Sequence, residues 1–399
     1  MNKKKFCAIL LSLVLVLLPN YSFADRIVGE DDNVKGYIIG VEDSGESLYE
    51  KNADEVMPIA SMSKIMTYVV VREALDRGEF SLDDEVKVSK NAAELNSWEY
   101  SALGLEEDMK IKVNDLLKGL IVVSGNDCAV ALAELVAGSE KDFVKLMNEK
   151  AEELGLETQT YYNASGIQSK DNKQNSSSAR DLFRLSKYAI EKYPELLQYS
   201  SMKQIDINTL DIHKPSVLPL VGEIDGVDGL KTGTTEEAGY CIITTCDMQK
   251  LDSKDKFRTI AVVMGASSND VRKSAATDLI YYVSRYFDLF KIADTKEKFE
   301  NLKMNSAQKG YVSLYPTENL TIIKKNDDRI SESVNINEDE KAPIKKGDVM
   351  GNVTIKYNDM EYDIDLVANE DQGQATKFTR VIRSLKDACN FLIECLIAS

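Results

Sequence analysis

Four Ser-x-x-Lys pairs stand in the sequence, with their serines at Ser61, Ser200, Ser253 and Ser306. On a helix, side chains three residues apart lie one turn apart and face the same way. A serine hydroxyl is a weak nucleophile until a neighbouring base takes its proton, and a neutral lysine amine can be that base. The spacing alone does not separate a catalytic pair from a chance one, so the rest of the chain must decide.

Two further motifs distinguish the first pair from the other three. A Ser-x-Asn triplet at 124–126 ends an apolar segment, although Ser-x-Asn recurs at 267–269 and 333–335. Lys-Thr-Gly occurs once, at 231–233, and leads into an apolar strand-like segment. Ser-x-x-Lys at the start of a helix, then Ser-x-Asn, then Lys-Thr-Gly is the order typical of penicillin-recognising serine enzymes. Only Ser61 is followed by both motifs at comparable spacing.

The histidine count argues against a zinc peptidase and disfavours a Ser-His-Asp triad, which the one histidine could still serve. The chain has a single histidine, His213, in a polar segment. A catalytic zinc site takes two or three histidines as a rule, and a Ser-His-Asp triad needs one beside its serine. We therefore expect no metal and no cofactor, and a lysine or glutamate as the base.

Charge and the N-terminal segment indicate where the protein works. The net charge of −17 argues against a nucleic-acid partner, because a phosphate backbone attracts a basic surface. Lysines at 3–5 precede an apolar run at 6–18, and Ser22 and Ala24 occupy the small-residue positions of a cleavage site. This predicts a signal peptide at 1–24 and an exported protein, with an uncleaved anchor as the alternative.

The cysteines do not form a disulfide framework. Five remain after the signal peptide, an odd number with wide spacing. Cys241 and Cys246 are five apart in a predicted strand and so point to opposite faces. We expect most of them to be small buried apolar residues.

The order of elements predicts an α+β fold. Strand patterns near the start and at 240–266 enclose several helical segments, which indicates an antiparallel sheet flanked by helices. We expect the motif helix at 59–77, a long polar surface loop at 163–181, and a closing helix that ends near Ile292. This catalytic domain would span 25–292, and short strands at 300–370 predict a small all-β domain.

The last segment, 376–399, is predicted to be an amphipathic helix. Apolar residues recur at helical spacing from Phe378 to Leu396, and four basic residues lie on the other side: Lys377, Arg380, Arg383 and Lys386. A terminal amphipathic helix with basic residues indicates an interfacial membrane anchor. The alternatives are a helix that docks on the β-domain and a dimerising helix.

Four stretches then carry a family resemblance: "ASMSKIMT", "SGNDCA", "DGLKTGTTEEAGY" and "SARD". They resemble the serine-type D-alanyl-D-alanine carboxypeptidases, which are low-molecular-mass penicillin-binding proteins. The resemblance covers about 25–292, and the β-domain and terminal helix match the family layout. It implies a β-lactamase/transpeptidase-like catalytic domain and removal of the terminal D-alanine from peptidoglycan stem peptides.

Part of the chemistry follows from the residues themselves. Ser61 would attack a peptide carbonyl, and Lys64 would take its proton if the amine were neutral. Burial beside a second cation lowers a lysine pKa, and Lys231 is the obvious cation. The backbone N–H of Ser61, at a helix N-terminus, would help to bind the oxyanion.

The remaining roles are implied by the resemblance. Ser124 would relay the proton to the leaving amine, and the N–H of Thr234 would be the second oxyanion donor, at a position where the family often has histidine. The resemblance also implies a set of substrate-binding residues: Asn126, Lys231, Thr232, Gly233, Thr234 and Arg272. For Arg272, a plain surface arginine is the alternative to a ligand of the substrate carboxylate.

The expected partners are stem peptides ending in D-Ala-D-Ala, β-lactams as covalent inhibitors, and a membrane surface. A class A β-lactamase is disfavoured, because Glu-x-x-Leu-Asn is absent between Asn126 and Lys231. An endopeptidase that cleaves D-alanyl cross-links stays open, since the same site chemistry serves both reactions. A non-catalytic penicillin sensor is disfavoured by the complete set of motif residues.

Overall fold

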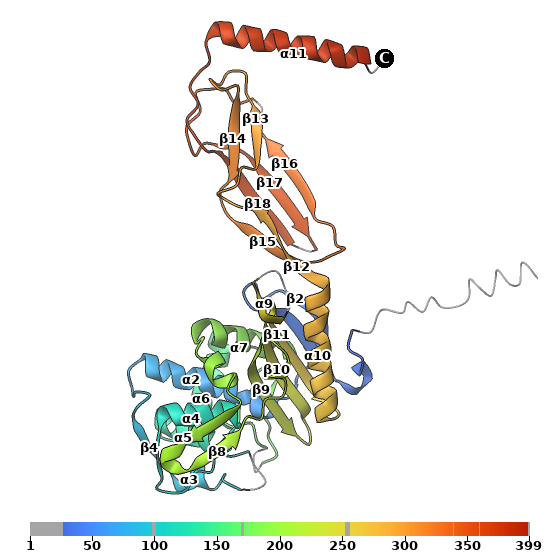
Figure 1. The fold of residues 1–399 in the computed structure, drawn as a ribbon. Helices are drawn as coiled ribbons and strands as arrows, with labels where there is room; N and C mark the ends of the chain where they lie inside the picture. The colour runs from blue at the N-terminus through green and yellow to red at the C-terminus, as the bar shows by residue number, and fades with distance from the viewer. Residues whose placement is uncertain are drawn as a thin grey trace, which may run out of the picture. The chain divides into compact units, whose positions relative to one another are not determined.

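The chain forms two compact units, one ending at Arg285 and one beginning at Tyr286 (Figure 1). The computed structural model describes residues 27–397 apart from 98–100, 169–170, 252–255, 338 and 359. The predicted signal peptide lies outside the described residues. Each unit has its own apolar core.

The first unit is built on a five-stranded antiparallel sheet. Its strand order is β2-β1-β11-β10-β9, so the strands predicted near the start form a hairpin that pairs with a strand more than 200 residues later. The central strands are buried on both faces, as their unbroken apolar sequences require. The strands are β1 (Gly36–Val41), β2 (Ser47–Lys51), β9 (Val227–Thr235), β10 (Gly239–Asp247) and β11 (Arg258–Ala266).

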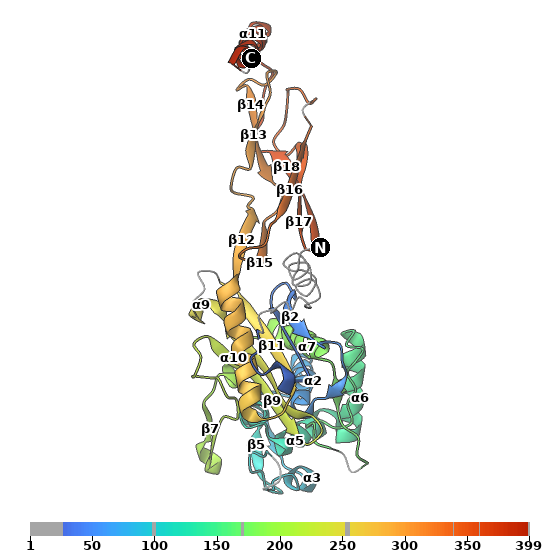
Figure 2. The same cartoon turned by 90° about the vertical axis from the view of Figure 1, so that its right-hand side faces the viewer.

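Helices cover both faces of this sheet, which confirms the predicted α+β architecture. Helix α10 runs along one face, and α7 packs on the other (Figures 1 and 2). Helix α2 is apolar almost all round and lies at the centre of the helical part, with most of its residues buried. The helices are α2 (Lys64–Asp76), α4 (Val113–Val122), α5 (Asn126–Ala137), α6 (Glu140–Glu153), α7 (Ala179–Lys192), α8 (Leu196–Ser200) and α10 (Asn269–Tyr286).

Short elements complete the first unit. They are η1 (Asp31–Asn33), η2 (Ala60–Ser63), η3 (Asn208–Leu210), α3 (Lys90–Ala93), α9 (Met248–Leu251), β3 (Met57–Pro58) paired with β6 (Ser176–Ser177), β4 (Glu85–Lys87) paired with β5 (Lys110–Lys112), and β7 (Gln204–Ile207) paired with β8 (Ile212–Pro215).

The second unit begins earlier than the sequence predicted. Helix α10 ends at Tyr286, not near Ile292, and the next seven residues form strand β12, which pairs with β15. A five-stranded antiparallel sheet follows, in the order β13-β14-β18-β17-β16. The strands are β12 (Phe287–Ala293), β13 (Glu300–Lys303), β14 (Tyr311–Pro316), β15 (Leu320–Lys325), β16 (Ser331–Ile336), β17 (Val349–Tyr357) and β18 (Met360–Ala368).

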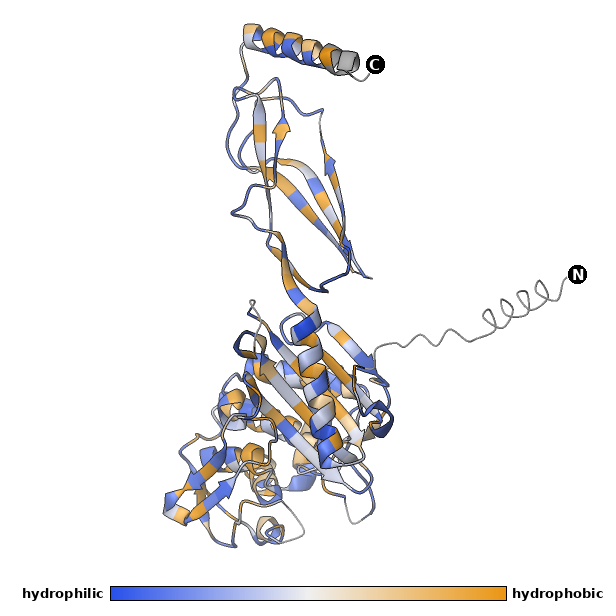
Figure 3. Cartoon of the chain, turned by 45° about the vertical axis from the view of Figure 1, so that its right-hand side comes forward, coloured by the Kyte–Doolittle hydropathy of each residue, from blue (hydrophilic) through white to orange (hydrophobic). Residues whose placement is uncertain are grey.

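The C-terminal helix α11 (Lys377–Ile397) packs on this β-domain through its polar face. The Arg383 guanidinium donates to the carbonyls of Ala307 at 2.7 Å and Gln308 at 3.0 Å, and Asp387 accepts from Asn305 at 2.8 Å. Helix α11 thus contacts the β-domain through its polar side and not through the apolar stripe, and the membrane anchor stays a prediction. Figure 3 shows orange and blue residues alternating along the helix. No helix in the described part of the chain combines the length and hydropathy that a membrane crossing needs.

Candidate active site

Ser61 and Lys64 lie at the junction of two helical elements. Ser61 is in the single turn η2, and Lys64 is the first residue of α2. The Lys64 amine lies 2.8 Å from the Ser61 hydroxyl. The predicted helix thus begins as a 3₁₀ turn, and the nucleophile candidate sits on its exposed side while Lys64 is fully buried.

Two carbonyl oxygens hold the other side of the Lys64 amine. Asn126 Oδ1 and the backbone oxygen of Ser165 each lie 2.7 Å from Nζ. Burial lowers the pKa of Lys64 to about 7. The amine can therefore be neutral near neutral pH, as a general base must be.

The physical cause of this pKa agrees with the prediction in one part and differs in another. We expected burial beside the charge of Lys231 to lower the Lys64 pKa; burial is the leading cause, but the other causes are Cys128 and Asp127, which act in the opposite direction. The charge effect falls on Lys231 instead. Burial, and after it the charges of Lys64 and Arg272, hold the pKa of Lys231 well below its usual range.

Strand β9 brings the Lys-Thr-Gly motif against the nucleophile. A Cβ on Gly233 would lie 2.8 Å from the Ile59 oxygen and 3.1 Å from the Ser61 nitrogen, so glycine permits this close approach. The Lys231 amine is buried and donates to the Thr232 carbonyl at 2.8 Å. Thr234, the predicted second oxyanion donor, directly follows Gly233 on the same strand.

Arg272 lies on α10, and its side chain reaches strand β9. It is only 7% exposed, and its guanidinium donates to Thr234 Oγ1 at 3.3 Å and to the Cys241 carbonyl at 3.2 Å. It also lies over the ring of Tyr240. Arg272 is therefore not a plain surface arginine, and its role as a ligand of the substrate carboxylate stays a prediction.

Ser124 lies in the connection between α4 and α5 with a left-handed backbone, φ 60°. The side chain is buried, two residues before Asn126. Among the described residues, the Ser124 hydroxyl makes no hydrogen bond to Lys64 or Lys231. Its role as a proton relay stays a prediction, as does the role of Thr232.

Two functional features escaped the sequence analysis. Ser165 contributes only its backbone carbonyl, which no residue type can signal, although "NASG" is a turn-forming stretch. Asp127 is buried, and its carboxylate accepts N–H bonds from Leu103, Gly104 and Leu105 at 2.9–3.0 Å. It thus holds the segment before α4 against the start of α5, where Asn126 begins the helix.

The histidine and the described cysteines, which could have served other kinds of catalysis, form no hydrogen bond with Ser61 or Lys64 among the contacts described above. His213 is exposed on β8 and its ring is 2.7 Å from Asp206. The described cysteines are free: Cys128, Cys241 and Cys246 are buried and Cys389 is exposed. Within the described ranges, no cluster of three histidine, cysteine or acidic side chains could hold a metal ion.

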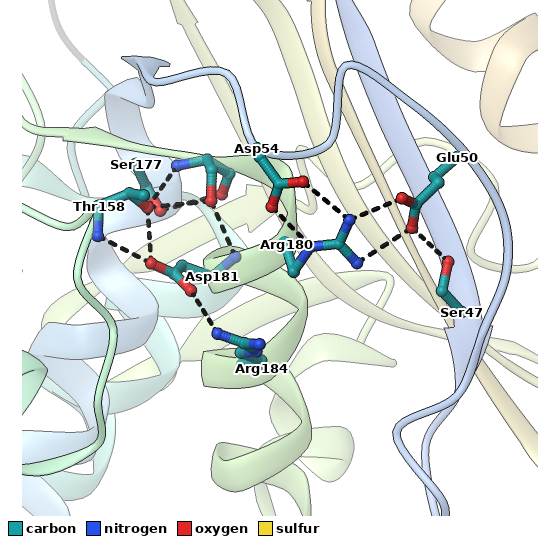
Figure 4. A network of polar contacts seen from close by, with 9 residues as sticks. Ser47, Glu50, Asp54, Thr158, Ser177, Arg180, Asp181 and Arg184 are labelled. Carbon is teal, nitrogen blue, oxygen red and sulfur yellow. Dashed lines mark hydrogen bonds and ion pairs between the residues drawn. The ribbon is translucent and has the colours of Figure 1, made fainter. Parts of the chain in front are cut away.

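The "SARD" stretch anchors the loop that carries Ser165. Arg180 forms ion pairs with Glu50 and Asp54, at 2.6 Å each (Figure 4). Asp181 accepts from the Thr158 hydroxyl at 2.6 Å and from the Thr158 N–H at 2.9 Å (Figure 4). Helix α7 is thereby tied at its N-terminus to β2 and to Thr158, which precedes the polar loop 163–181.

Comparison with known proteins places this arrangement in a family. The family model described as D-alanyl-D-alanine carboxypeptidase matches residues 29–268, and a model of the penicillin-binding protein 5 C-terminal domain matches 287–373. The chain belongs to the D-alanyl-D-alanine carboxypeptidase family. The predicted fold class is confirmed with it.

Relatives of this family match along nearly the whole chain. The D-alanyl-D-alanine carboxypeptidase DacF of Bacillus subtilis is 30% identical, over 96% of this chain and 99% of its own. Penicillin-binding protein 5 of Haemophilus influenzae is 27% identical with a TM-score of 0.66, over 86% of this chain and 98% of its own. Penicillin-binding protein D2 of Listeria monocytogenes, solved in a cefotaxime-bound form, is 34% identical with a TM-score of 0.56. That match covers 63% of this chain and 97% of its own.

Proposed function

We propose that this protein is a serine-type D-alanyl-D-alanine carboxypeptidase that removes the terminal D-alanine of peptidoglycan stem peptides through an acyl-enzyme on Ser61. The observation that carries the proposal is the buried Lys64 amine, 2.8 Å from the Ser61 hydroxyl, with a pKa of about 7. Family membership supplies the substrate class.

Acylation begins with the transfer of the Ser61 proton to the neutral Lys64 amine. The Ser61 oxygen then attacks the carbonyl carbon of the scissile bond. The resulting oxyanion would be bound by the N–H groups of Ser61 and Thr234, which Gly233 allows to come close together. The tetrahedral intermediate then collapses and its C–N bond breaks. The proton held by Lys64 passes by way of Ser124 to the leaving amine, and D-alanine departs.

Substrate recognition is assigned to residues of α5, β9 and α10. Asn126 would hold the peptide carbonyl of the substrate. Lys231, Thr232 and Arg272 would bind the carboxylate of the departing D-alanine, an anion that suits the two buried basic side chains of this set. Water then hydrolyses the Ser61 ester, with Lys64 again as the base. A β-lactam would acylate Ser61 in the same way.

The test is release of D-alanine from a peptide ending in D-Ala-D-Ala. We expect release by the wild type and none by Ser61→Ala or Lys64→Ala. Ser306→Ala is the matched control, because Ser306 belongs to another Ser-x-x-Lys pair in the β-domain. A folded wild type that releases no D-alanine would contradict the proposed activity, and an active Ser61→Ala would contradict the nucleophile. A cross-linked dimer of the same peptide tests the endopeptidase alternative.

We also propose that the exported protein binds the outer face of the cell membrane through α11. The apolar stripe of that helix faces away from the docked side, with Phe378, Val381, Ile382, Leu385 and Ile393 between 49 and 76% exposed. At 3.6 residues per turn, Lys377 and Lys386 fall on the two borders of the stripe. Apolar side chains bordered by lysines fit an anionic bilayer interface.

Two variants with the same added charge test this surface. Leu385→Asp places a carboxylate in the stripe, whereas Asn390→Asp places it among the polar residues of the same helix. We expect Leu385→Asp to weaken binding to phosphatidylglycerol vesicles about ten-fold or more, because one buried leucine is lost. Asn390→Asp should bind like the wild type. Equal binding by all three proteins would contradict the anchor.

A further inference from the structure

A four-residue turn of the polar loop, 163–166, packs directly against the helix that carries the base. The Ser165 carbonyl accepts from Lys64 at 2.7 Å, and the Ala164 carbonyl accepts from the Thr67 hydroxyl at 2.6 Å. Lys64 and Thr67 are three apart on α2, so one face of the helix binds two successive carbonyls of the turn. The turn therefore has a defined position along α2.

The donors and acceptors around the Lys64 amine determine where its lone pair points. A neutral amine has two N–H donors and one lone pair. Asn126 Oδ1 and the Ser165 carbonyl oxygen can only accept, so they take the two N–H groups of Lys64. The lone pair is then left for the third neighbour, the Ser61 hydroxyl. After proton transfer the ammonium has a third donor for the Ser61 oxygen, and no group needs to move.

Asn163 shapes the turn from within. It is buried, and its Oδ1 accepts the N–H of Gly166 at 2.6 Å and of Ser165 at 3.2 Å. Its Nδ2 donates to the Ile167 carbonyl at 2.7 Å. These bonds pair the N–H groups of Ser165 and Gly166. The Gly166 N–H belongs to the same peptide as the carbonyl that faces Lys64, so the bond fixes that peptide.

Asn175 fastens the turn to the nucleophile segment. It is fully buried, and its Nδ2 donates to the Asn163 carbonyl and to the Ser63 hydroxyl, at 2.9 Å each. Its Oδ1 accepts from the Tyr162 N–H at 2.7 Å. The Ser63 hydroxyl in turn donates to the Ala60 carbonyl at 2.7 Å. One side chain thus connects the polar loop to the residues on either side of Ser61.

Gly166 completes the contact. Its φ is +85°, and a Cβ there would lie 1.9 Å from the Ala60 oxygen and 2.9 Å from the Ser61 nitrogen. The turn consequently touches both the base and the backbone N–H of the nucleophile. Only glycine fits in this conformation at this distance.

We propose that Asn163 and Asn175 are positioning residues for the catalytic base: they hold the 163–166 turn so that the Ser165 carbonyl directs the lone pair of Lys64 at Ser61. The inference rests on the proposed function, because it assigns the proton acceptor of that reaction. It predicts that acylation depends on two asparagines that touch no substrate.

The first test removes the acceptor that shapes the turn. Asn163→Ala should slow acylation by a fluorescent penicillin about 10- to 100-fold, as expected when a reacting group is misplaced. Asn305→Ala is the matched control, since it also removes an asparagine side chain, but one in the β-domain whose amide donates to Asp387 at 2.8 Å. We expect it to acylate at the wild-type rate. Circular dichroism and thermal melting establish that both variants are folded.

The second test uses Asn163→Asp and pH. The carboxylate keeps the acceptor but adds a negative charge near Lys64, which raises the pKa of the base. Its acylation rate should therefore be low at neutral pH and recover toward the wild-type rate as the pH rises. Asn163→Ala should remain slow at every pH. A merely structural role would leave the pH profile of the folded fraction unchanged.

The outcomes separate this inference from the proposed function. If the wild type neither releases D-alanine nor is acylated, the proposed function fails. If the wild type is active and Asn163→Ala acylates within two-fold of it, the positioning role fails. An unshifted pH profile for Asn163→Asp likewise overturns the inference.

Discussion

At the residue scale, the pKa of Lys64 sets the pH range in which the enzyme can be acylated. Burial lowers this pKa from 10.5 to about 7, so the amine is protonated below pH 7 and neutral above it. We expect the acylation rate to rise with pH through about 7 and to level off above. Stopped-flow measurement with a fluorescent penicillin gives this profile, and an ascending limb near pH 10 would contradict the burial argument.

A second residue-scale prediction concerns Asp127. Its carboxylate accepts the N–H groups of Leu103, Gly104, Leu105 and Cys128. Asp127→Asn replaces one acceptor oxygen by an NH₂ group that faces donors, which leaves buried N–H groups unpaired. We expect the free energy of unfolding to fall by about 2–3 kcal/mol. Urea denaturation measures it, and a loss below about 0.5 kcal/mol would show that the segment rearranges without strain.

The residues of this site differ in how far the sequence could predict them. Side-chain chemistry at characteristic spacing identified Ser61, Lys64 and Lys231, because a nucleophile, a base and a cation need particular residue types. The Ser165 carbonyl and the Asp127 bonds could not be found in this way. They depend on which backbone groups a fold brings near a side chain, and every residue has a backbone carbonyl and, except proline, an N–H.

At the element scale, the ion pairs of Arg180 tie helix α7 to the hairpin β1–β2. Arg180→Met keeps the apolar stem and removes the bonds to Glu50 and Asp54. We expect the free energy of unfolding to fall by about 1 kcal/mol, because these groups are partly exposed. Arg184→Met is the control. Arg184 is more exposed and contacts Asp181 at 3.3 Å, so its loss should cost less.

The same ion pairs have a pH dependence with a definite sign. The guanidinium of Arg180 lowers the pKa values of Glu50 and Asp54 below 4.5 and 3.8. Carboxyls with lowered pKa values add stability above their ordinary values and lose it as the pH falls through the lowered ones. The stability difference between the wild type and Arg180→Met should therefore shrink from pH 7 toward pH 3. Melting temperatures at both pH values check this, and a constant difference would assign the effect to packing.

Element boundaries show where periodicity is ambiguous. The segment 287–293 continues the apolar pattern of α10, so the sequence predicted a helix through Ile292. It forms β12 instead because it pairs with β15, about thirty residues later. Likewise, the apolar stripe of α11 follows from the sequence, but the pattern does not indicate that the polar side contacts the β-domain. The contacts of Arg383 depend on carbonyls of a distant turn.

At the scale of the whole molecule, the proposed catalytic residues and the proposed membrane-binding helix lie in different units. Every proposed catalytic residue lies before Arg285, and the apolar cores of the two units share no residue. Catalysis therefore should not require the second unit.

We expect a protein of residues 25–285 to fold and to be acylated by penicillin at a rate within about two-fold of the full chain, since no proposed catalytic group is removed. It should lose binding to phosphatidylglycerol vesicles, because the apolar stripe of α11 is absent. Acylation kinetics and vesicle sedimentation measure the two properties on the same samples, with Ser61→Ala in the full chain as the unreactive control. A folded truncated protein with much slower acylation would show that the β-domain acts on the site, and retained vesicle binding would place the membrane contact in the first unit.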